Sequence, residues 1–191
     1  MKVLFVNCCP RGEASRTLAL ARRFLGGLKA AEIITHDLCS MNLPPVNAEI
    51  LSRRETVCDA RDWNNPIVQP AVEFVRADLI VIAAPYWDLS FPSMLKIWVE
   101  HMWVRNLTFH YEHDTCIGHC RASHCVYITT SGSPVGENDW GTGYIRAVMK
   151  ALGVKEFHAI KAEGIDLDGA DVAEILAAAA HEAALLAEEI Q

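Results

Sequence analysis

Residues 7–17, NCCPRGEASRT, concentrate side chains that can take part in chemistry. Two adjacent cysteines, Cys8 and Cys9, follow the apolar opening MKVLFV and precede a run rich in Gly, Ser, Thr and Arg. Three kinds of site have such a composition: a thiol nucleophile, a metal site and a cradle for a phosphate group. The spacing of the residues distinguishes these three.

The spacing disfavours both roles for the cysteines. In a cysteine-dependent phosphatase, the loop between Cys and Arg wraps a single phosphate, so nucleophile and guanidinium meet around one atom. Here Cys9 and Arg16 enclose six residues and Cys8 and Arg16 enclose seven, at least one too many for that loop. Metal binding by the pair is disfavoured because adjacent side chains point apart and zinc-binding cysteines are usually spaced further apart.

The phosphate cradle fits the segment better. Ser15 and Thr17 supply hydroxyls at the start of a helix predicted over residues 15–29. The free N–H groups at a helix start form the positive end of the helix dipole, and together these groups can hold a phosphate without a lysine. The alternative for Ser15 is a purely structural role as the N-cap of this helix.

Potential metal ligands also crowd into residues 110–125. Imidazole and thiol side chains at this density can hold a metal ion. Their spacings match no zinc pattern, and Cys125 begins a predicted buried strand, so we expect structural roles and no bound metal. The side chains concerned are His110, His113, Cys116, His119, Cys120, His124 and Cys125.

Short apolar runs alternate with longer amphipathic segments along the chain, which is typical of βαβ units around a parallel sheet. We predict an α/β fold, a doubly wound sheet of five parallel strands with helices on both faces. The predicted strands are residues 2–7, 32–37, 79–84, 125–130 and 155–162. The predicted helices are residues 15–29, 92–104, 144–152 and 169–190, with a surface helix within 52–63.

Length and composition limit the class of protein. A chain of 191 residues with 51% hydrophobic residues suits one domain spanning residues 1–191. The net charge of −7 leaves no basic stripe, so nucleic acid is not an expected partner. No apolar run approaches about 18 residues, and the seven cysteines show no disulfide spacing, so we expect a cytoplasmic protein with reduced thiols and no membrane contact.

Doubly wound sheets bind ligands at the carboxyl ends of their strands. The loops at that edge are expected at residues 7–15, 85–91 and 130–140. The second loop presents the flat side chains of PYW, and the third is rich in glycine, so its backbone can approach a ligand closely. A phosphate pocket beside a slot with aromatic walls describes a site for flavin mononucleotide (FMN).

Two long segments, DLIVIAAPYWDLSFPSMLKIWVEHMWVRNLTFHY and GHCRASHCVYITTSGS, carry a family resemblance. The chain resembles the flavodoxin-like NAD(P)H:quinone oxidoreductases, and within them the FMN-dependent azoreductases, over essentially its whole length. The resemblance implies a flavodoxin-like sheet of strand order 2-1-3-4-5 and a strand at TF-x-Y. It also implies ping-pong transfer of hydride from NADH or NADPH to flavin N5, followed by two-electron reduction of a quinone or azo compound.

The resemblance assigns site residues as well. It places the FMN phosphate at Ser15, Arg16 and Thr17 with Cys9 beside it, where the helix N-terminus would lower the pKa of this thiol. It implies no general acid, and it leaves Tyr111 and Trp140 as candidate walls of the substrate pocket. The residues implied to contact the ring are Pro85, Tyr86, Trp87, Asp88, Leu89, Thr130, Ser131, Gly132 and Ser133.

A homodimer is implied too, with the helix face around Trp98, Met102 and Trp103 as a candidate contact. The chain departs from the azoreductase pattern at Cys9, at Asp88 and in the turn Ser-Gly-Ser. Two other functions stay open. One is a flavodoxin-type electron carrier, although the chain lacks the usual T-x-T-G-x-T loop, and the other is a metal-responsive protein that uses the His/Cys cluster.

Overall fold

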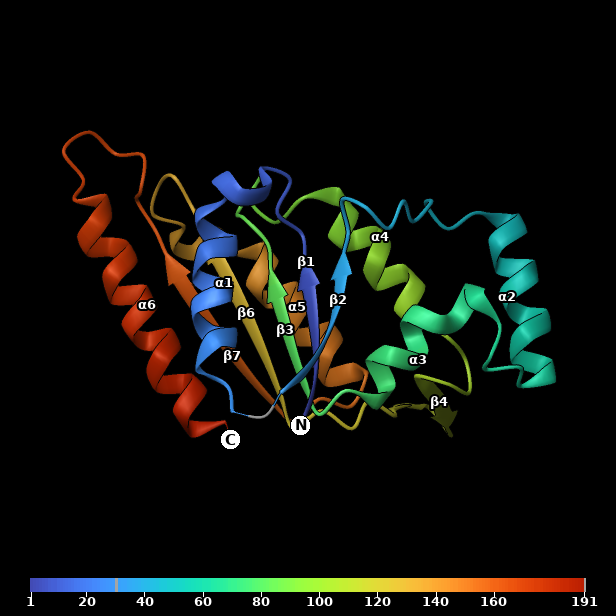
Figure 1. The fold of residues 1–191 in the computed structure, drawn as a ribbon. Helices are drawn as coiled ribbons and strands as arrows, with labels where there is room; N and C mark the ends of the chain where they lie inside the picture. Colours follow the sequence, from blue (N-terminus) through green and yellow to red (C-terminus); the bar gives the residue numbers. More distant parts are fainter. Residues whose placement is uncertain (30, 191) are drawn as a thin grey trace.

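The computed structural model of the protein describes residues 1–29 and 31–190, and its centre is a five-stranded sheet (Figure 1). The strand order is β2-β1-β3-β6-β7, and every neighbouring pair is parallel. The predicted flavodoxin-like order is confirmed, the fourth and fifth predicted strands being β6 and β7. The strands are β1 (Lys2–Asn7), β2 (Glu32–Asp37), β3 (Leu79–Ala83), β6 (His124–Thr130) and β7 (Glu156–Ala162).

Helices cover both faces of this sheet (Figure 1). On one face, α1 (Arg16–Gly27) packs beside α6 (Val172–Glu189), and on the other lie α3 (Gln69–Arg76), α4 (Ser93–Met102) and α5 (Trp140–Ala151). Successive side chains of a strand point to opposite faces, so Leu4 and Val6 join one core and Val3 and Phe5 join the other. This double burial explains why the central strands read as continuous apolar runs.

Three differences from the predicted elements have local causes. Helix α5 begins at Trp140 rather than at residue 144, because the Asp139 carboxylate caps it by accepting the Thr142 N–H at 2.9 Å. Helix α2 (Ala48–Ala60) begins before residue 52, because Asn47 caps it in the same way. Helix α3 was not expected from QPAVEFVR, in which proline occupies one of the first helical positions, where no N–H is needed.

A small antiparallel hairpin lies outside the main sheet. It pairs β4 (Phe109–Glu112) with β5 (Thr115–Gly118), and β4 is the strand that the family resemblance implies at TF-x-Y. A Cβ on Gly118 would lie 2.0 Å from the backbone of Leu152, so the hairpin packs directly on the last turn of α5. It therefore lies away from the carboxyl ends of the parallel strands (Figure 1).

The aromatic face of α4 points into the core. Trp98 and Met102 are both 0% exposed, and Trp98 Nε1 donates a hydrogen bond to His36 Nδ1 at 3.0 Å. Trp103 packs edge-on against Phe109, with ring centroids 5.1 Å apart. The expectation that this face contributes to a dimer contact is therefore wrong for Trp98 and Met102, which are interior residues.

Among the described helices, none has both the length and the apolar character that a bilayer span requires.

Candidate functional site at the carboxyl ends of the strands

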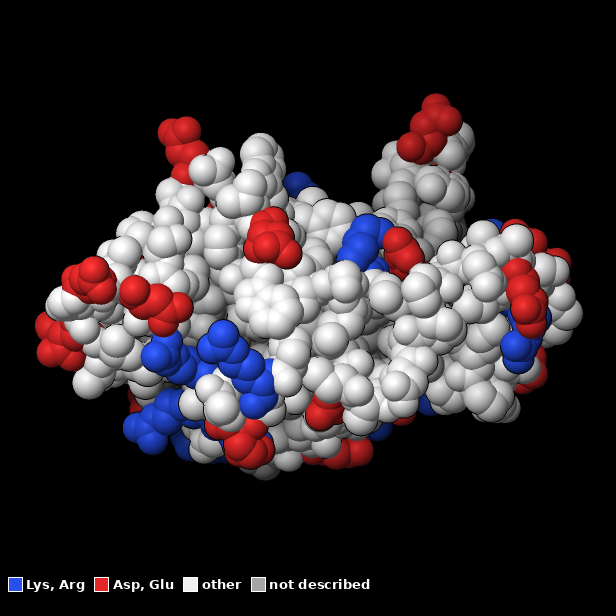
Figure 2. All heavy atoms as spheres, turned by 90° about the horizontal axis from the view of Figure 1, so that it is seen from above, with Lys and Arg blue, Asp and Glu red and all other residues white. Residues whose placement is uncertain are grey.

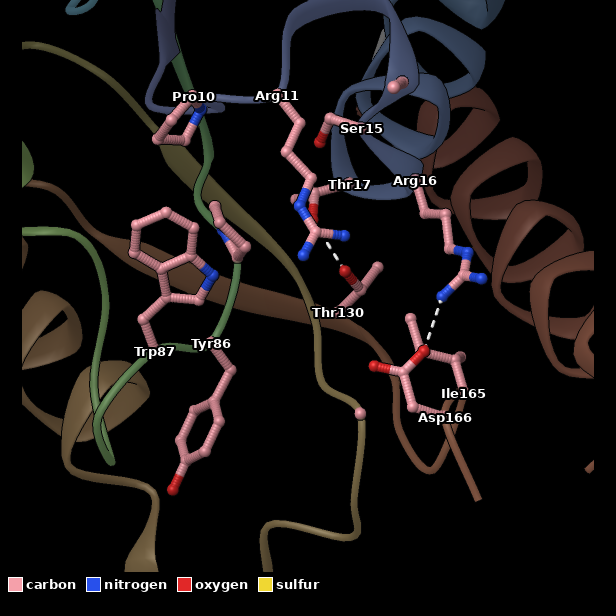
Figure 3. A pocket seen from close by; sticks show the side chains of 13 residues that line it. Pro10, Arg11, Ser15, Arg16, Thr17, Tyr86, Trp87, Thr130, Ile165 and Asp166 are labelled. Carbon is pink, nitrogen blue, oxygen red and sulfur yellow. Dashed lines mark hydrogen bonds and ion pairs between the residues drawn. The ribbon is translucent and has the colours of Figure 1, made fainter. Parts of the chain in front are cut away.

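A cavity of about 280 Å³ opens at the carboxyl ends of β1, β3 and β6 (Figure 3). Four chain segments meet around it, namely residues 10–17, 85–87, 130–132 and 165–166. Three of these follow the strands that the sequence singled out, and the fourth follows β7. The lining residues are Pro10, Arg11, Ala14, Ser15, Arg16, Thr17, Pro85, Tyr86, Trp87, Thr130, Gly132, Ile165 and Asp166.

The start of helix α1 forms the polar side of the cavity. Ser15 is the N-cap, and its Oγ accepts a hydrogen bond from the Leu18 N–H at 3.2 Å. The Ser15 hydroxyl proton, which the Cys9 sulfur can accept, can turn instead toward a ligand, and the other N–H groups of the first turn have no partner within the helix. The structural and the functional readings of Ser15 are thus compatible, because the capping serine also faces the cavity.

A buried pair of hydroxyls joins this helix to strand β6. Thr17 Oγ1 and Thr130 Oγ1 lie 2.7 Å apart, although 113 residues separate them in sequence. One proton lies between the two oxygens, which leaves the second hydroxyl proton free to turn toward a ligand.

The two arginines of the cavity have different surroundings (Figure 3). Arg16 Nη1 lies 2.9 Å from Asp166 Oδ1, so the residue expected at the phosphate is paired with a carboxylate. The Arg11 side chain extends over the cavity toward Thr17 and Thr130, and no ion pair of the described residues includes it. Arg11 is therefore the better-placed cation for an anionic ligand.

The opposite wall is aromatic. Tyr86 and Trp87 leave strand β3 through Pro85, and the Tyr86 N–H donates to the Thr130 carbonyl at 3.0 Å, which holds the two loops together. Tyr86 Oη donates to the carbonyl of Asn138 at 3.0 Å. These contacts fix the tyrosine, while Trp87 stays 40% exposed at the mouth, so a flat ligand can reach both side chains.

Four of the residues implied to contact the ring do not line the cavity. Asp88 and Leu89 form the centre of a tight turn closed by paired hydrogen bonds between Trp87 and Ser90, and their φ angles are 49° and 65°. Ser131 and Ser133 also lie outside the cavity, and Ser131 Oγ donates a hydrogen bond to the Ser133 carbonyl at 2.7 Å.

Gly132, between those two serines, does line the cavity. A Cβ at this position would lie 2.6 Å from Asp166 Oδ2, so a larger residue here would displace the Asp166 carboxylate from its present position. The Asp166 N–H completes this contact by donating to the Gly132 carbonyl at 2.9 Å.

Cys9 is separated from the cavity as well. It is 1% exposed, and its Sγ donates to the Ala83 carbonyl at 3.6 Å. Burial raises the pKa of Cys9 to about 11, although a hydrogen bond from Ser15 acts in the opposite direction. The expectation that the helix N-terminus lowers this pKa is therefore wrong, because loss of solvent outweighs the helix dipole.

The two candidate pocket walls lie elsewhere. Tyr111 is on the β4–β5 hairpin, which is not part of the cavity. Trp140 begins α5 and lines a separate apolar groove with Phe91 and Tyr144, on the far side of the turn at Asp88. Trp140 is 65% exposed there.

The His/Cys cluster expected at residues 110–125 is not one assembly. His110 Nδ1 and His119 Nε2 lie 2.6 Å apart on the hairpin side. Cys120 and Cys125 are buried thiols in the core, and burial raises the pKa of both. His124 instead faces His158 of β7.

Sequence reasoning missed five lining residues. Pro10, Arg11 and Ala14 lie in the first predicted loop, where the phosphate cradle was predicted from the hydroxyl residues alone. Ile165 and Asp166 follow β7, and the rule that ligands bind at carboxyl ends would have included this loop if applied to every strand.

Seen from above the strand ends, uncharged residues make up most of the middle of this face, with acidic and basic groups scattered around them (Figure 2).

A family model described as a flavodoxin-like fold matches residues 1–186. The chain is 31% identical over 186 residues to the FMN-dependent NADH:quinone oxidoreductase 2 of Clostridium acetobutylicum, covering 92% of each protein. It is 31% identical over 180 residues to the FMN-dependent NADH:quinone oxidoreductase of Clostridium perfringens, covering 91% of each.

Solved structures share the fold at lower identity. An azoreductase from Bacillus anthracis superposes with a TM-score of 0.87 at 21% identity over 99% of each chain. An FMN-dependent NADH-azoreductase from the same species, solved in complex with FMN, gives a TM-score of 0.86 at 19% identity over 100% of this chain and 99% of its own.

Proposed function

The chain belongs to the family with the flavodoxin-like fold, and from this premise we propose that it reduces quinones by a ping-pong reaction. The protein is an FMN-dependent oxidoreductase that takes its electrons from NADH, as do the curated relatives by their names. The observation that carries the proposal is the single cavity in which an anion-binding helix start faces the aromatic pair Tyr86 and Trp87.

The donor set of the cavity fits FMN. The first turn of α1, the Ser15 hydroxyl and the Arg11 guanidinium would hold the phosphate, because together they provide N–H and O–H donors and positive charge. Tyr86 and Trp87 would flank the ring, and the segment 130–132 would close another edge.

When bound, FMN would supply the redox chemistry, namely hydride acceptance from NADH and two-electron donation to the acceptor. The protein supplies binding and orientation. The Thr17–Thr130 pair fixes the helix start against β6, and the Tyr86 hydrogen bonds fix the aromatic wall. Trp87 is partly exposed at the mouth of the cavity, so the nicotinamide and then the quinone would reach the flavin through the same opening. Use of one opening by the two substrates in turn is the condition for ping-pong exchange.

An anaerobic stopped-flow experiment tests this proposal. The FMN-loaded protein is mixed with NADH, and we expect the flavin absorbance to bleach; a second mixing with 1,4-benzoquinone should restore it with two electrons per flavin. Steady-state double-reciprocal plots should be parallel. Absence of bleaching by both NADH and NADPH would contradict the proposal, and reoxidation only in one-electron steps by a protein partner would identify an electron carrier instead.

We propose azo compounds as further acceptors, because the chain shares its fold with structures that carry the azoreductase name. Loss of azo-dye colour under NADH, measured beside quinone reduction on the same preparation, tests this point. A protein that reduces the quinone and leaves the dye unchanged would limit the activity to quinones.

We also propose that the chain acts as a single domain and as a cytoplasmic homodimer. The support for the dimer is the apolar groove of about 660 Å³ that follows the turn at Asp88, in which Phe91, Trp140 and Tyr144 are open to contact with a second copy. Light scattering of the FMN-loaded protein should give twice the chain mass of 21.1 kDa. A monomer mass would contradict the dimer without affecting the proposed reaction.

A further inference from the structure

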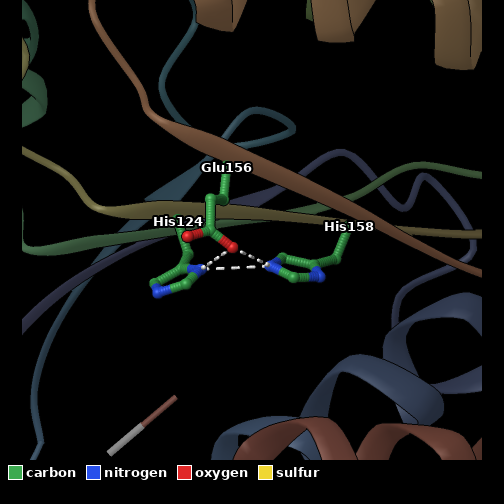
Figure 4. Close-up of side chains that lie close together, drawn as sticks. All are labelled: His124, Glu156 and His158. Carbon is green, nitrogen blue, oxygen red and sulfur yellow. Dashed lines mark hydrogen bonds and ion pairs between the residues drawn. The ribbon is translucent and has the colours of Figure 1, made fainter. Parts of the chain in front are cut away.

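Three potential metal ligands converge at the amino ends of two parallel strands, the opposite end of the sheet from the cavity (Figure 4). They are His124, the first residue of β6, and Glu156 and His158 of β7. His124 Nδ1 lies 3.0 Å from His158 Nε2, and Glu156 Oε2 lies 3.7 Å from the first nitrogen and 3.9 Å from the second. We propose that these three side chains form a binding site for a divalent transition-metal ion of the zinc type.

The register of the strands explains this convergence. His124 and Glu156 are direct partners in the parallel pairing of β6 with β7, and His158 comes two residues after Glu156. Residues two apart on a strand point to the same face, so all three side chains share the face that α1 and α6 cover. The arrangement is therefore fixed by regular sheet geometry and not by a flexible loop.

The distances suit a tetrahedral ion. Metal bonds of about 2.0–2.2 Å place neighbouring ligands about 3.3 Å apart, and the three observed distances lie on both sides of this value. Two imidazoles and one carboxylate are a ligand set that zinc and related ions accept, and it leaves a fourth position for water. The three side chains are 22%, 65% and 29% exposed in the order His124, Glu156 and His158, so an ion can enter from solvent.

The surrounding charge also favours a cation. Helix α6 ends at Glu189, whose negatively charged carboxylate is close enough to His158 for an electrostatic interaction. The carboxyl end of a helix also carries the negative end of its dipole. The site is distinct from the cavity, because His124 and Thr130 are six residues apart at the two ends of β6, which corresponds to about 20 Å. An ion at this site would link the start of β6 to β7, which is an edge strand of the sheet.

Zinc titration of the FMN-loaded chain, purified without a histidine tag and treated with a chelator, tests the proposal. We expect one Zn²⁺ per chain by calorimetry and a rise in the thermal midpoint on binding, because the ion binds the folded state. His124→Ala and His158→Ala should each weaken binding by more than the roughly 10- to 100-fold that loss of an outer-shell partner causes. His181→Ala, which removes an exposed histidine of α6, is the matched control and should bind as the unmodified chain does.

Two further readouts keep the test decisive. FMN content and quinone reduction should be unchanged in all three variants, which shows that they fold. X-ray absorption at the zinc edge should give only nitrogen and oxygen neighbours near 2.0–2.2 Å, because a cysteine ligand would add sulfur at about 2.3 Å. No zinc binding by the unmodified chain, undiminished binding by His124→Ala and His158→Ala, or a sulfur shell would each overturn the proposal.

Discussion

Thr17 Oγ1 and Thr130 Oγ1 lie 2.7 Å apart beside the cavity and join the first helix to the fourth strand of the parallel sheet. Both side chains are buried, so each hydroxyl depends on the other for its hydrogen bond. The contact connects stability to cofactor binding, because the same two residues line the proposed FMN site.

Removing one of the two hydroxyls should therefore lower the free energy of unfolding by more than half of the loss caused by removing both. Thr17→Val leaves the Thr130 hydroxyl buried without its partner, and we expect the free energy of unfolding to fall by about 1–3 kcal/mol. The double variant Thr17→Val/Thr130→Val should lose less than the sum of the two single variants, since no unpaired hydroxyl remains. Urea unfolding of the four proteins measures this, and strictly additive losses would contradict the pairing.

The two arginines should differ in their contribution to cofactor affinity. Arg11→Gln removes the unpaired cation over the cavity, and a lost charge-assisted hydrogen bond of about 1.5–3 kcal/mol should raise the Kd for FMN about 10- to 150-fold. Arg16→Gln should have a smaller effect, because Arg16 is already paired with Asp166. Fluorescence titration of the apoprotein with FMN compares the two variants, and the reverse order would refute the assignment.

A glycine in place of Leu89 should relieve the backbone strain of the turn at Asp88 and Leu89. Leu89 has φ at 65°, a conformation that costs a non-glycine residue about 1–2 kcal/mol, and glycine loses roughly half of this gain through its more flexible unfolded state. We expect Leu89→Gly to raise the thermal midpoint by about 1–4 °C. Leu167→Gly is the matched control, since Leu167 is equally exposed at 52% and lacks a positive φ, so its midpoint should fall.

His36 should make the free energy of unfolding depend on pH at values below the ordinary pKa of histidine. Burial lowers the pKa of His36, although the Glu73 carboxylate, whose Oε2 lies 2.6 Å from Nε2, acts in the opposite direction. His36 of the unfolded chain therefore takes up a proton near pH 6.5, while His36 of the folded chain stays neutral to lower pH. The free energy of unfolding should therefore fall as the pH drops below about 6.5.

His36→Gln isolates this contribution, because it keeps an acceptor for Trp98 and a donor for Glu73 without titrating. Urea unfolding at several pH values between 5 and 7.5 should show a shallower slope for the variant. Equal slopes for the two proteins would mean that His36 titrates alike in the folded and unfolded states.

The cysteines should react in an order set by exposure. The thiolate is the reactive form, and with its pKa raised to about 11 Cys9 holds about one thiolate in a thousand at pH 8. Cys39 is exposed, so iodoacetamide should label it first. Peptide mass spectrometry over time measures the order; rapid labelling of Cys9 in the folded protein would contradict its burial beneath the cavity.

The regular elements were predictable because their signals are local. The alternation of apolar runs with amphipathic segments predicted all five parallel strands, and β1 and β2 have the predicted bounds. The start of α5 was misplaced because capping by Asp139 depends on one side-chain hydrogen bond that periodicity does not contain. The hairpin and α3 are too short to produce a clear period.

The cavity was predictable only in part. The loops after β1, β3 and β6 follow from the rule on strand ends, and eight of the thirteen lining residues are among those that the sequence analysis assigns to the site. The pairing of Arg16 with Asp166 could not be read from the sequence, because 150 residues separate the two. The pKa of Cys9 was misjudged for a similar reason, since the enclosure of its thiol depends on the neighbouring Ala83 carbonyl.

The loop after β7 has a consequence for how the protein is made. Asp166 and Ile165 complete a cavity that begins at Pro10, so the ribosome must synthesise nearly the whole chain before all its walls exist. At about 5–20 residues per second, the 150 residues from Arg16 to Asp166 take roughly 8–30 s to synthesise, so the first wall of the cavity exists well before the last. Capture of the flavin is therefore one of the final events in the biogenesis of this protein, and it occurs on a sheet that already holds all five strands.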